Sequence, residues 1–182
     1  MAIYISMLRG INVGGHKKIK MDRLRQSFEA LGFDQVKTYI QSGNVVFKGA
    51  KLSTAALSRK IEDKILSDFG FSVSVLTRTA DEMRQTIEAN PFLQQRGIDP
   101  GKLHVTFLSE APLPAALKKL ADLTTAPNQF HCLGRDIYFY LPNGVAESVL
   151  MKSPVDRMLA VVITTRNWRT VSTLYQMCQD CR

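Results

Sequence analysis

The sequence has little of the features that would assign it to a specialised class. Its 182 residues include three cysteines and one tryptophan. Cys178 and Cys181 form a C-x-x-C pair at the end of a predicted helix, where the helix dipole disfavours a thiolate, and no second pair completes a zinc site. Cys132 has the character of a small core residue. We therefore expect no disulfide framework, redox pair or metal centre, and the sequence leaves any cofactor unidentified.

Long apolar segments are also missing. The longest strongly apolar run, Met158 to Ile163, is far shorter than the roughly 20 residues of a transmembrane helix. The N-terminus has no basic region ahead of an apolar stretch, and its apolar run is interrupted at Arg9. These absences predict a cytoplasmic protein with no membrane partner and no secretory signal.

Positive charge is what the sequence does have. The formal net charge is +8, and between residues 9 and 25 there is one acid, Asp22, among six basic residues: Arg9, Lys17, Lys18, Lys20, Arg23 and Arg25. This bias favours an anionic partner, either a small molecule or a nucleic acid, and the alternative is a basic surface that serves solubility.

Hydrophobic periodicity in residues 1–78 predicts the element order β-α-β-β-α-β. Residues 2–8 are apolar and β-forming, and residues 21–31 repeat apolar side chains at helical spacing. The next strand alternates, which puts Val36, Thr38 and Ile40 on one side, and "SGN" predicts a hairpin turn. Ser53 is the expected cap of a second helix, and "FSVSVLT" is the closing strand. This order is typical of a ferredoxin-like unit.

The remaining chain repeats the same order. Residues 79–101 are predicted to form a linking helix, opened by the Thr79 and Glu82 capping box, and a loop. Residues 102–182 then contain a strand, a helix with Leu113 turned inward, a hairpin, a short helix capped by Ser153, a strand and a last helix. We predict an α+β protein of two tandem ferredoxin-like units with an extra C-terminal helix, although no sequence identity between the halves indicates a duplication.

Two long motifs resemble a known family. The opening "YISMLRGINVGGHKKIKMDRLRQSFEALGFDQVKTYIQSGNVVF" and the ending "TTRNWRTVSTLYQM" are similar to the bacterial family called domain of unknown function 1697. The resemblance implies a compact α/β fold of two ferredoxin-like parts, and it implies no activity. One departure is visible, because "LAVVITT" lacks the glycine that the family pattern places near Ala160.

The glycine-rich stretch after the first strand is the first candidate site. Gly10 and Gly15 have the G-x-x-x-x-G spacing of a P-loop, but "HKK" follows in place of Lys-Ser/Thr, which argues against a Walker-type NTPase. Adjacent glycines can instead aim backbone N–H groups at an anion, and the alternative is a plain hinge. The ligand-binding residues predicted here are Arg9, Asn12, Gly14, Gly15, Lys17 and Lys18.

The second candidate is "TTRNWRT" near the C-terminus. Thr165 or Asn167 is expected to cap the last helix, and an anion at that end would offset the unfavourable arginines of its first turn. Trp168 is expected either to stack on a ligand or to lie in the core. The residues predicted to bind ligand here are Arg166, Asn167, Trp168 and Arg169.

Other polar residues give weaker signals. Ser42 and Asn44 at the hairpin tip offer hydrogen-bonding groups to a ligand, although turns favour such residues without any function. The three histidines lie on different predicted elements, and no Ser or Cys has a recognisable base partner, so no catalytic residue is identified and enzymatic activity stays open.

Three functions follow from these observations. The leading prediction is a basic cleft between the glycine-rich loop and the Arg-Asn-Trp-Arg motif that binds a phosphate-bearing or other anionic small molecule. The first alternative is an RNA- or DNA-binding protein that stacks bases on Tyr4 and Phe47, as RNA-recognition modules with this element order do. The second alternative is a protein-interaction module without a ligand.

Overall fold

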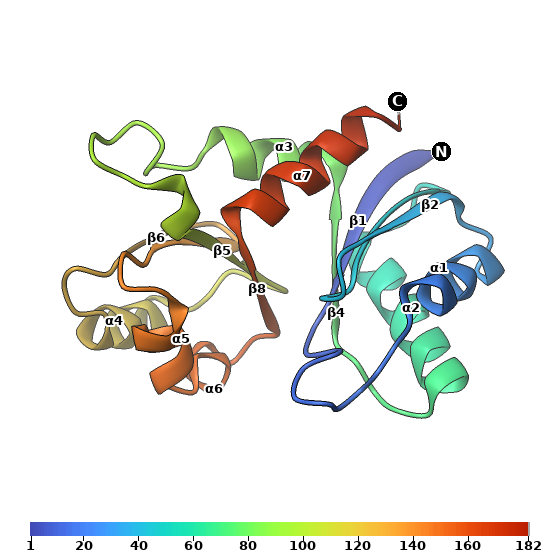
Figure 1. The fold of residues 1–182 in the computed structure, drawn as a ribbon, viewed down its shortest axis with the longest axis horizontal. Helices are drawn as coiled ribbons and strands as arrows, with labels where there is room; N and C mark the ends of the chain where they lie inside the picture. Colours follow the sequence, from blue (N-terminus) through green and yellow to red (C-terminus); the bar gives the residue numbers. More distant parts are fainter. Residues whose placement is uncertain (182) are drawn as a thin grey trace. The chain divides into compact units, whose positions relative to one another are not determined.

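The computed structural model describes residues 1–181. The chain is a mixed α+β protein that separates into two compact units, coloured from blue to red along the chain in Figure 1. The first unit comprises Met1–Gln85 together with the chain from Thr173 onward, and the second comprises Thr86–Ser172. This division differs from the sequence-based one at residues 78 and 101, because two helices span the unit boundaries and the end of the last helix groups with the first unit.

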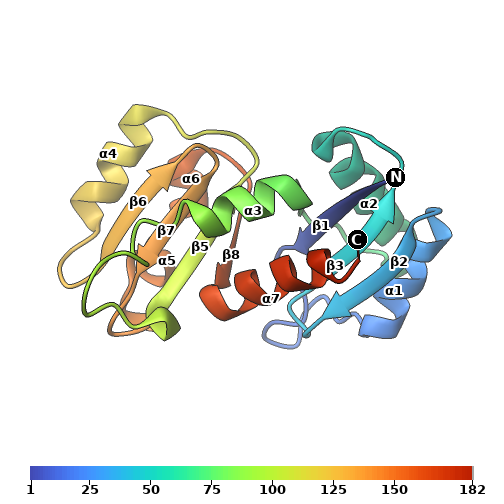
Figure 2. The same ribbon diagram turned by 90° about the horizontal axis from the view of Figure 1, so that it is seen from above.

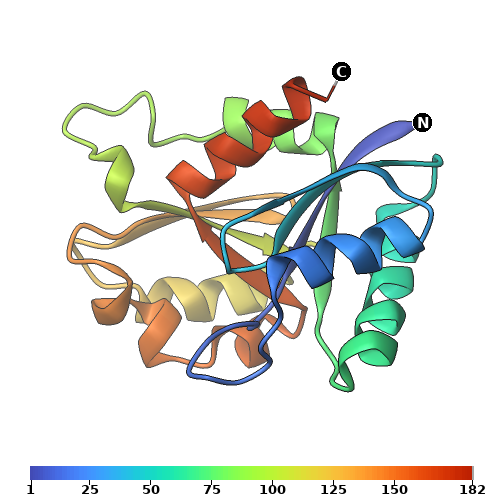
Figure 3. The same ribbon diagram turned by 45° about the vertical axis from the view of Figure 1, so that its right-hand side comes forward.

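The first unit contains a four-stranded antiparallel sheet with the order β2-β3-β1-β4. Its elements are β1 (Ala2–Leu8), α1 (Met21–Ala30), β2 (Asp34–Tyr39), β3 (Asn44–Gly49), α2 (Thr54–Phe69) and β4 (Val75–Thr79), followed by α3 (Ala80–Glu88), which continues into the second unit. Figure 3 shows α1 and α2 on the same side of this sheet, with the long loop that leads from β1 into α1.

The apolar faces of the helices and strands of the first unit pack together in one hydrophobic core. Leu24 and Phe28 of α1 and Leu57, Ile61 and Ile65 of α2 are fully buried against the sheet, as their spacing predicts. The caps expected from the sequence are present, since Ser53 Oγ accepts from the Ala56 amide and Thr79 and Glu82 exchange capping hydrogen bonds.

The second unit repeats the order of elements with the sheet β6-β7-β5-β8, whose strands are seen side by side in Figure 2. Its elements are β5 (Leu103–Leu108), α4 (Pro114–Leu123), β6 (Gln129–Leu133), β7 (Asp136–Tyr140), α5 (Val149–Lys152), α6 (Val155–Leu159), β8 (Ile163–Asn167) and α7 (Trp168–Gln179). Its core packs Leu120 of α4 and Leu159 of α6 against Ile137 and Phe139 of the sheet.

Two residues predicted to be inside are exposed. Ile40 is 48% exposed with a φ of 50°, because β2 ends at Tyr39 and Ile40 lies in the turn that follows. Leu113 is 71% exposed, because α4 begins at Pro114 and not at Pro112 as predicted, which leaves Leu113 as the N-cap outside the helical stripe. The short helix after Ser153 likewise begins later, with Pro154 as its N-cap. β4 also begins later than predicted, at Val75.

The two sheet aromatics proposed to stack on RNA bases lie in the core. Tyr4 and Phe47 are almost fully buried and stack on each other with ring centroids 5.7 Å apart. Phe47 also contacts Phe28 of α1 and Phe33, so both rings face the helices. The prediction that they bind bases is therefore wrong, because the helices cover the face to which these rings point.

Two further features answer questions that the sequence raised. Ala160 ends α6 with a φ of 54°, a left-handed conformation that suits the glycine expected there. Among the helices of residues 1–181, none combines the length and the hydrophobicity that crossing a bilayer requires.

Candidate functional site

The glycine-rich loop is an insertion that the fold itself does not require. In the first unit the chain uses 12 residues, 9–20, to pass from β1 to α1. The equivalent connection in the second unit, from β5 to α4, uses five residues, 109–113. Because both connections join the same elements of the same topology, the longer one needs a reason beyond chain connection.

The tip of this loop is a small hairpin. Val13 and His16 form a β-bridge, and the His16 amide donates to the Val13 carbonyl oxygen at 3.0 Å. Gly14 and Gly15 occupy the two central positions with φ of 58° and 79°, as a two-residue type I′ turn requires. The turn alone therefore explains both glycines, and their predicted role as anion donors stays a prediction.

Asn12 holds the base of the loop together. Its Nδ2 donates to the carbonyl oxygens of Ile19 at 3.0 Å and Gln41 at 2.8 Å, and its Oδ1 accepts from the Ile19 amide at 2.8 Å. One side chain thus closes the loop on itself and ties it to the tip of the β2–β3 hairpin. Asn12 adopts a φ of 55°, which asparagine tolerates better than most residues.

The hairpin tip packs tightly under the loop. Gly43 has a φ of 78°, and a Cβ there would lie 2.6 Å from Ile11 Cδ1 and 2.9 Å from Leu8 Cβ. Asn44 is fully buried and donates through Nδ2 to the Tyr39 carbonyl and to Ser42 Oγ. Both polar residues that were predicted to bind ligand at this tip thus make hydrogen bonds that shape the turn, and a ligand role for them stays a prediction.

Two cavities of the first unit involve this loop and share no lining residue. The first, called here the α1 cavity, has a volume of about 800 Å³ and is lined by Asn12, Gly15, Lys18, Ile19, Lys20, Met21, Asp22 and Gln41. The second, called here the β4 cavity, has a volume of about 520 Å³ and is lined by Arg9, Gly10, Lys17, Glu62, Asp63, Leu66, Ser72, Val73 and Ser74.

The α1 cavity contains the start of a helix that no side chain caps. Lys20 is the N-cap residue of α1, and its side chain makes no capping hydrogen bond. The first-turn amides of a helix have no partner within the helix, and they carry its positive partial charge. Lys18 and Lys20 add two full positive charges to the lining, whereas Asp22 adds one negative charge.

The β4 cavity has both signs of charge on its lining. Lys17 Nζ donates to the Ser72 carbonyl oxygen at 2.7 Å, and Glu62 Oε1 accepts from the Val75 amide at 2.8 Å. Arg9 and Asp63 supply one further charge of each sign. Of the loop residues predicted to bind one anion together, Arg9 and Lys17 therefore line this cavity, and Asn12, Gly15 and Lys18 line the other.

The second candidate site, the "TTRNWRT" motif, lies in the second unit. It forms the end of β8 and the start of α7. Arg166 is buried, and its Nη1 donates to Thr164 Oγ1 at 2.8 Å and to the Thr165 carbonyl at 2.9 Å. Burial lowers the pKa of the Arg166 guanidinium to about 10, so it remains charged at neutral pH. Asn167 caps α7 by accepting from the Thr170 amide at 2.8 Å, as predicted.

Trp168 and Arg169 begin α7 with opposite exposure. Trp168 is 8% exposed, as expected if it lies in the core, and Arg169 is exposed. A joint site with the glycine-rich loop would need residues of both units, and it stays a prediction.

A counterpart of this motif in the first unit escaped the sequence reasoning. Arg78 of β4 pairs with Ile5 as Arg166 of β8 pairs with Val105, and both arginines are buried. One residue earlier, each strand carries a threonine whose hydroxyl meets a hydroxyl of the neighbouring strand at 2.8 Å, Thr77 with Ser6 and Thr165 with Thr106. The Thr-Arg pair followed by a helix cap is therefore a repeated feature of the fold, and this repetition favours a structural role.

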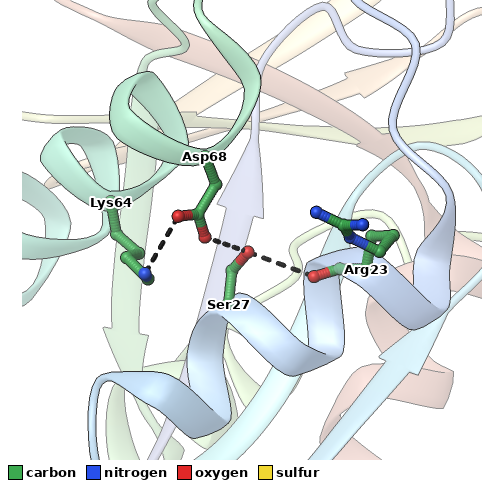
Figure 4. A network of polar contacts seen from close by, with 4 residues as sticks. All are labelled: Arg23, Ser27, Lys64 and Asp68. Atoms are coloured by element: carbon green, nitrogen blue, oxygen red, sulfur yellow. Dashed lines mark hydrogen bonds and ion pairs between the residues drawn. The ribbon is translucent and has the colours of Figure 1, made fainter.

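A polar network between α1 and α2 was also missed (Figure 4). Ser27 Oγ donates to Asp68 Oδ2 at 2.6 Å, and Lys64 Nζ contacts Asp68 Oδ1 at 2.9 Å. The hydrogen bond from Ser27, followed by that from Lys64, holds the pKa of Asp68 below its ordinary value. The i, i+4 spacing of Lys64 and Asp68 was visible in the sequence, but their approach to α1 required the packed helices.

Metal-binding side chains do not cluster in the described part of the chain. No cluster of three or more His, Cys, Asp or Glu side chains there is able to hold a metal ion. Burial lowers the pKa of His104, which favours its neutral form in β5. Cys178 and Cys181 are both buried, and neither forms a disulfide.

Comparison with known proteins places the chain in a family without assigning an activity. A solved structure described as "conserved bacterial protein SP0830 from Streptococcus pneumoniae" is similar, with a TM-score of 0.76 and 26% sequence identity over 97% of this chain and 98% of that one. No curated protein matches the sequence. Residues 1–138 match the family described as "Protein of unknown function (DUF1697)". The chain therefore belongs to the DUF1697 family, as the opening motif indicated.

Proposed function

We propose that the protein binds a phosphate-bearing or other anionic small molecule in the α1 cavity. The ligand's anionic group lies at the N-terminus of α1, where the first-turn amides of the helix provide hydrogen-bond donors. Lys18 and Lys20 neutralise its charge, and Gly15 and Gln41 border the remaining volume. We propose binding only and assign no reaction to the bound molecule.

The observation that carries this proposal is the unequal length of two equivalent connections. The second unit joins its first strand to its first helix with five residues, whereas the first unit uses 12 and bends several of them into left-handed conformations. Of the left-handed residues of this loop, Asn12, with a φ of 55°, and Lys17, with a φ of 46°, are not glycines. Strain of this kind costs about 1 kcal/mol or more per residue and is concentrated at functional sites.

The distribution of charge supports the same location. Residues 1–85 contain 14 lysine and arginine residues against eight acidic residues, so this part of the chain carries +6 of the net +8. Lys17, Lys18 and Lys20 are all exposed on the loop. An anion in the α1 cavity would meet two lysines, the positive end of a helix dipole and one opposing carboxylate, Asp22.

A wider form of the proposal retains the C-terminal motif. In that form Arg166, Asn167, Trp168 and Arg169 complete a cleft with the glycine-rich loop. The exposed side chain of Arg169, in the first turn of α7, is what supports this form. The β-α-β-β-α-β order and the matching strand orders likewise support the proposal that both units are ferredoxin-like.

The test is a binding screen with matched variants of the full chain. Thermal unfolding is measured at low salt with inorganic phosphate, sugar phosphates and nucleotides, because a ligand at 100 times its Kd stabilises the folded state by about 2.7 kcal/mol. We expect the double variant Lys18→Ala/Lys20→Ala to weaken binding of the best compound by about tenfold or more, as expected for lost charge-assisted hydrogen bonds.

The control is the double variant Lys37→Ala/Lys51→Ala, which removes two exposed positive charges of the first unit from outside both cavities. It should leave the affinity nearly unchanged. The proposal fails if no anion stabilises the wild type, or if both double variants lose the same affinity, since the second result would reflect net charge alone.

Nucleic acid is the second candidate, and the charge of residues 1–85 is the observation in its favour. Base stacking on Tyr4 and Phe47 is excluded by their burial, so binding would rest on phosphate contacts. Such contacts release counterions, and the affinity would then fall steeply with salt. Mixed-sequence RNA and DNA titrated at two salt concentrations distinguish this candidate from a small-molecule site.

A further inference from the structure

The β4 cavity differs from the α1 cavity in its charge. Its lining contains two basic residues, Arg9 and Lys17, and two acidic residues, Glu62 and Asp63. A lining with balanced charges neither attracts a polyanion strongly nor repels one, but it offers partners to both ends of a dipolar molecule. The β4 cavity therefore suits a dipolar ligand, whereas the ligand proposed for the α1 cavity is an anion.

We infer that the β4 cavity binds a free α-amino acid with an aliphatic side chain. The ligand's carboxylate pairs with Arg9 and Lys17, and its ammonium group pairs with Glu62 and Asp63. This site lies beyond the function proposed above, because the two cavities share no residue and either can exist without the other.

Backbone hydrogen bonds fix one charge of each sign. The ammonium group of Lys17 is held by the carbonyl oxygen of Ser72, and the carboxylate of Glu62 is held by the amide of Val75. These two backbone positions are three residues apart, so the segment between them spans about 10 Å at most. An α-amino acid has its two charged groups next to each other, and with one hydrogen bond of about 3 Å at each end it fits within such a span.

Apolar groups on the same lining suit an aliphatic side chain. Leu66 of α2 lines the cavity and is 48% exposed, so part of its surface is available to a ligand. Val73 also lines the cavity. A methyl or isobutyl group placed against Leu66 would bury apolar surface, at about 25 cal/mol for each Å² removed from water.

Other ligand classes fit this lining less well. A metal ion would find two carboxylates beside two cationic side chains, and the described residues contain no cluster of three metal-ligating side chains there. A simple anion would meet Glu62 and Asp63, and a simple amine would meet Arg9 and Lys17. Only a molecule with both charges pairs with all four groups.

The test compares L-leucine with two analogues that each lack one of its charges. Full-length protein is titrated by NMR or calorimetry with L-leucine, with 4-methylpentanoate, which lacks the ammonium group, and with 3-methylbutylamine, which lacks the carboxylate. We expect leucine to bind and to shift the backbone amide signals of residues 72–75. Each analogue should bind about tenfold more weakly, as the loss of one hydrogen bond between charged groups predicts.

Isosteric variants locate the site. Glu62→Gln retains an oxygen that can accept from the Val75 amide but removes the charge. Asp63→Asn removes the charge of the exposed acid beside it. Each should weaken leucine binding by about tenfold, whereas Asp81→Asn, an exposed acid of α3 outside the cavity, should not change it.

Three outcomes overturn the inference. These are the absence of leucine binding at millimolar concentrations, equal binding of leucine and 4-methylpentanoate, and equal binding by wild type and the two isosteric variants. The phosphate-binding experiment with the Lys18 and Lys20 variant tests the α1 cavity and not the β4 cavity. Its outcome is therefore independent of the outcome of the leucine experiment.

Discussion

Replacement of Asn12 tests how the glycine-rich loop is held in place. The side chain makes three hydrogen bonds, two to the backbone of Ile19 and one to the carbonyl of Gln41. Ile11 and Ile19 on either side of the hairpin are buried in the first core, so the loop cannot detach without exposing them. The loss of these bonds should therefore lower the free energy of unfolding of the protein.

The magnitude follows from the number of bonds and from the backbone conformation. At about 1 kcal/mol for each hydrogen bond, Asn12→Gly should destabilise the protein by about 2–3 kcal/mol, since glycine adopts the φ of 55° without strain. Asn12→Ala loses the same bonds and adds about 1 kcal/mol of left-handed strain. Asn12→Asp retains the acceptor for the Ile19 amide but directs a carboxylate oxygen at two carbonyl oxygens, so it should be at least as destabilising as the glycine variant.

Urea unfolding of the three variants measures these differences, and hydrogen exchange at the Ile19 amide reports the loop directly. Gln41→Ala is the matched control, because it removes the neighbouring side chain and keeps the carbonyl that Asn12 contacts. We expect the control to change stability by less than about 0.5 kcal/mol. The reasoning is refuted if Asn12→Ala and Asn12→Gly are equally stable, or if Ile19 exchange is unchanged in both.

Two further predictions concern stability. Ala160→Gly should stabilise the protein by about 0.5–1 kcal/mol in thermal unfolding, because glycine adopts the left-handed cap of α6 without a Cβ clash; destabilisation would contradict this account. Ser27→Ala should cost about 1 kcal/mol at neutral pH, because it removes the hydrogen bond that contributes most to lowering the pKa of Asp68. A carboxyl with a lowered pKa stabilises the fold above its unfolded pKa and loses that contribution as the pH falls through the folded one, so the difference between Ser27→Ala and wild type should shrink below pH 3.8. A pH-independent difference would show that the contact is not electrostatic.

Local signals in the sequence account for most of the elements. The first helix, the Ser53 cap and the Asn167 cap are where spacing and capping chemistry predicted them, because each depends on residues within one or two turns. The errors occurred where the next element decides the outcome. Ile40 faces solvent because β2 ends one residue before it and the chain turns there, and Tyr4 faces the core because two helices cover that side of the sheet.

The candidate site was predictable in its location and not in its arrangement. The excess of basic residues and the three glycines drew attention to residues 9–20 without any structure. The sequence did not indicate that Arg9 and Lys17 line one cavity while Lys18 and Asn12 line another. That separation depends on α2 and the segment between α2 and β4, which supply Glu62 and Ser72 from more than 40 residues further along the chain.

The sequence by itself determined the family, the mixture of helices and strands, and the concentration of positive charge near the N-terminus, because these properties depend on short-range patterns and composition. Only the tertiary structure decided that Asn12 ties the loop to the tip of the β2–β3 hairpin, and that a Thr-Arg pair recurs at the same register in both sheets. These features arise from contacts between segments distant in the chain, and the pattern of neighbouring residues carries no record of such contacts.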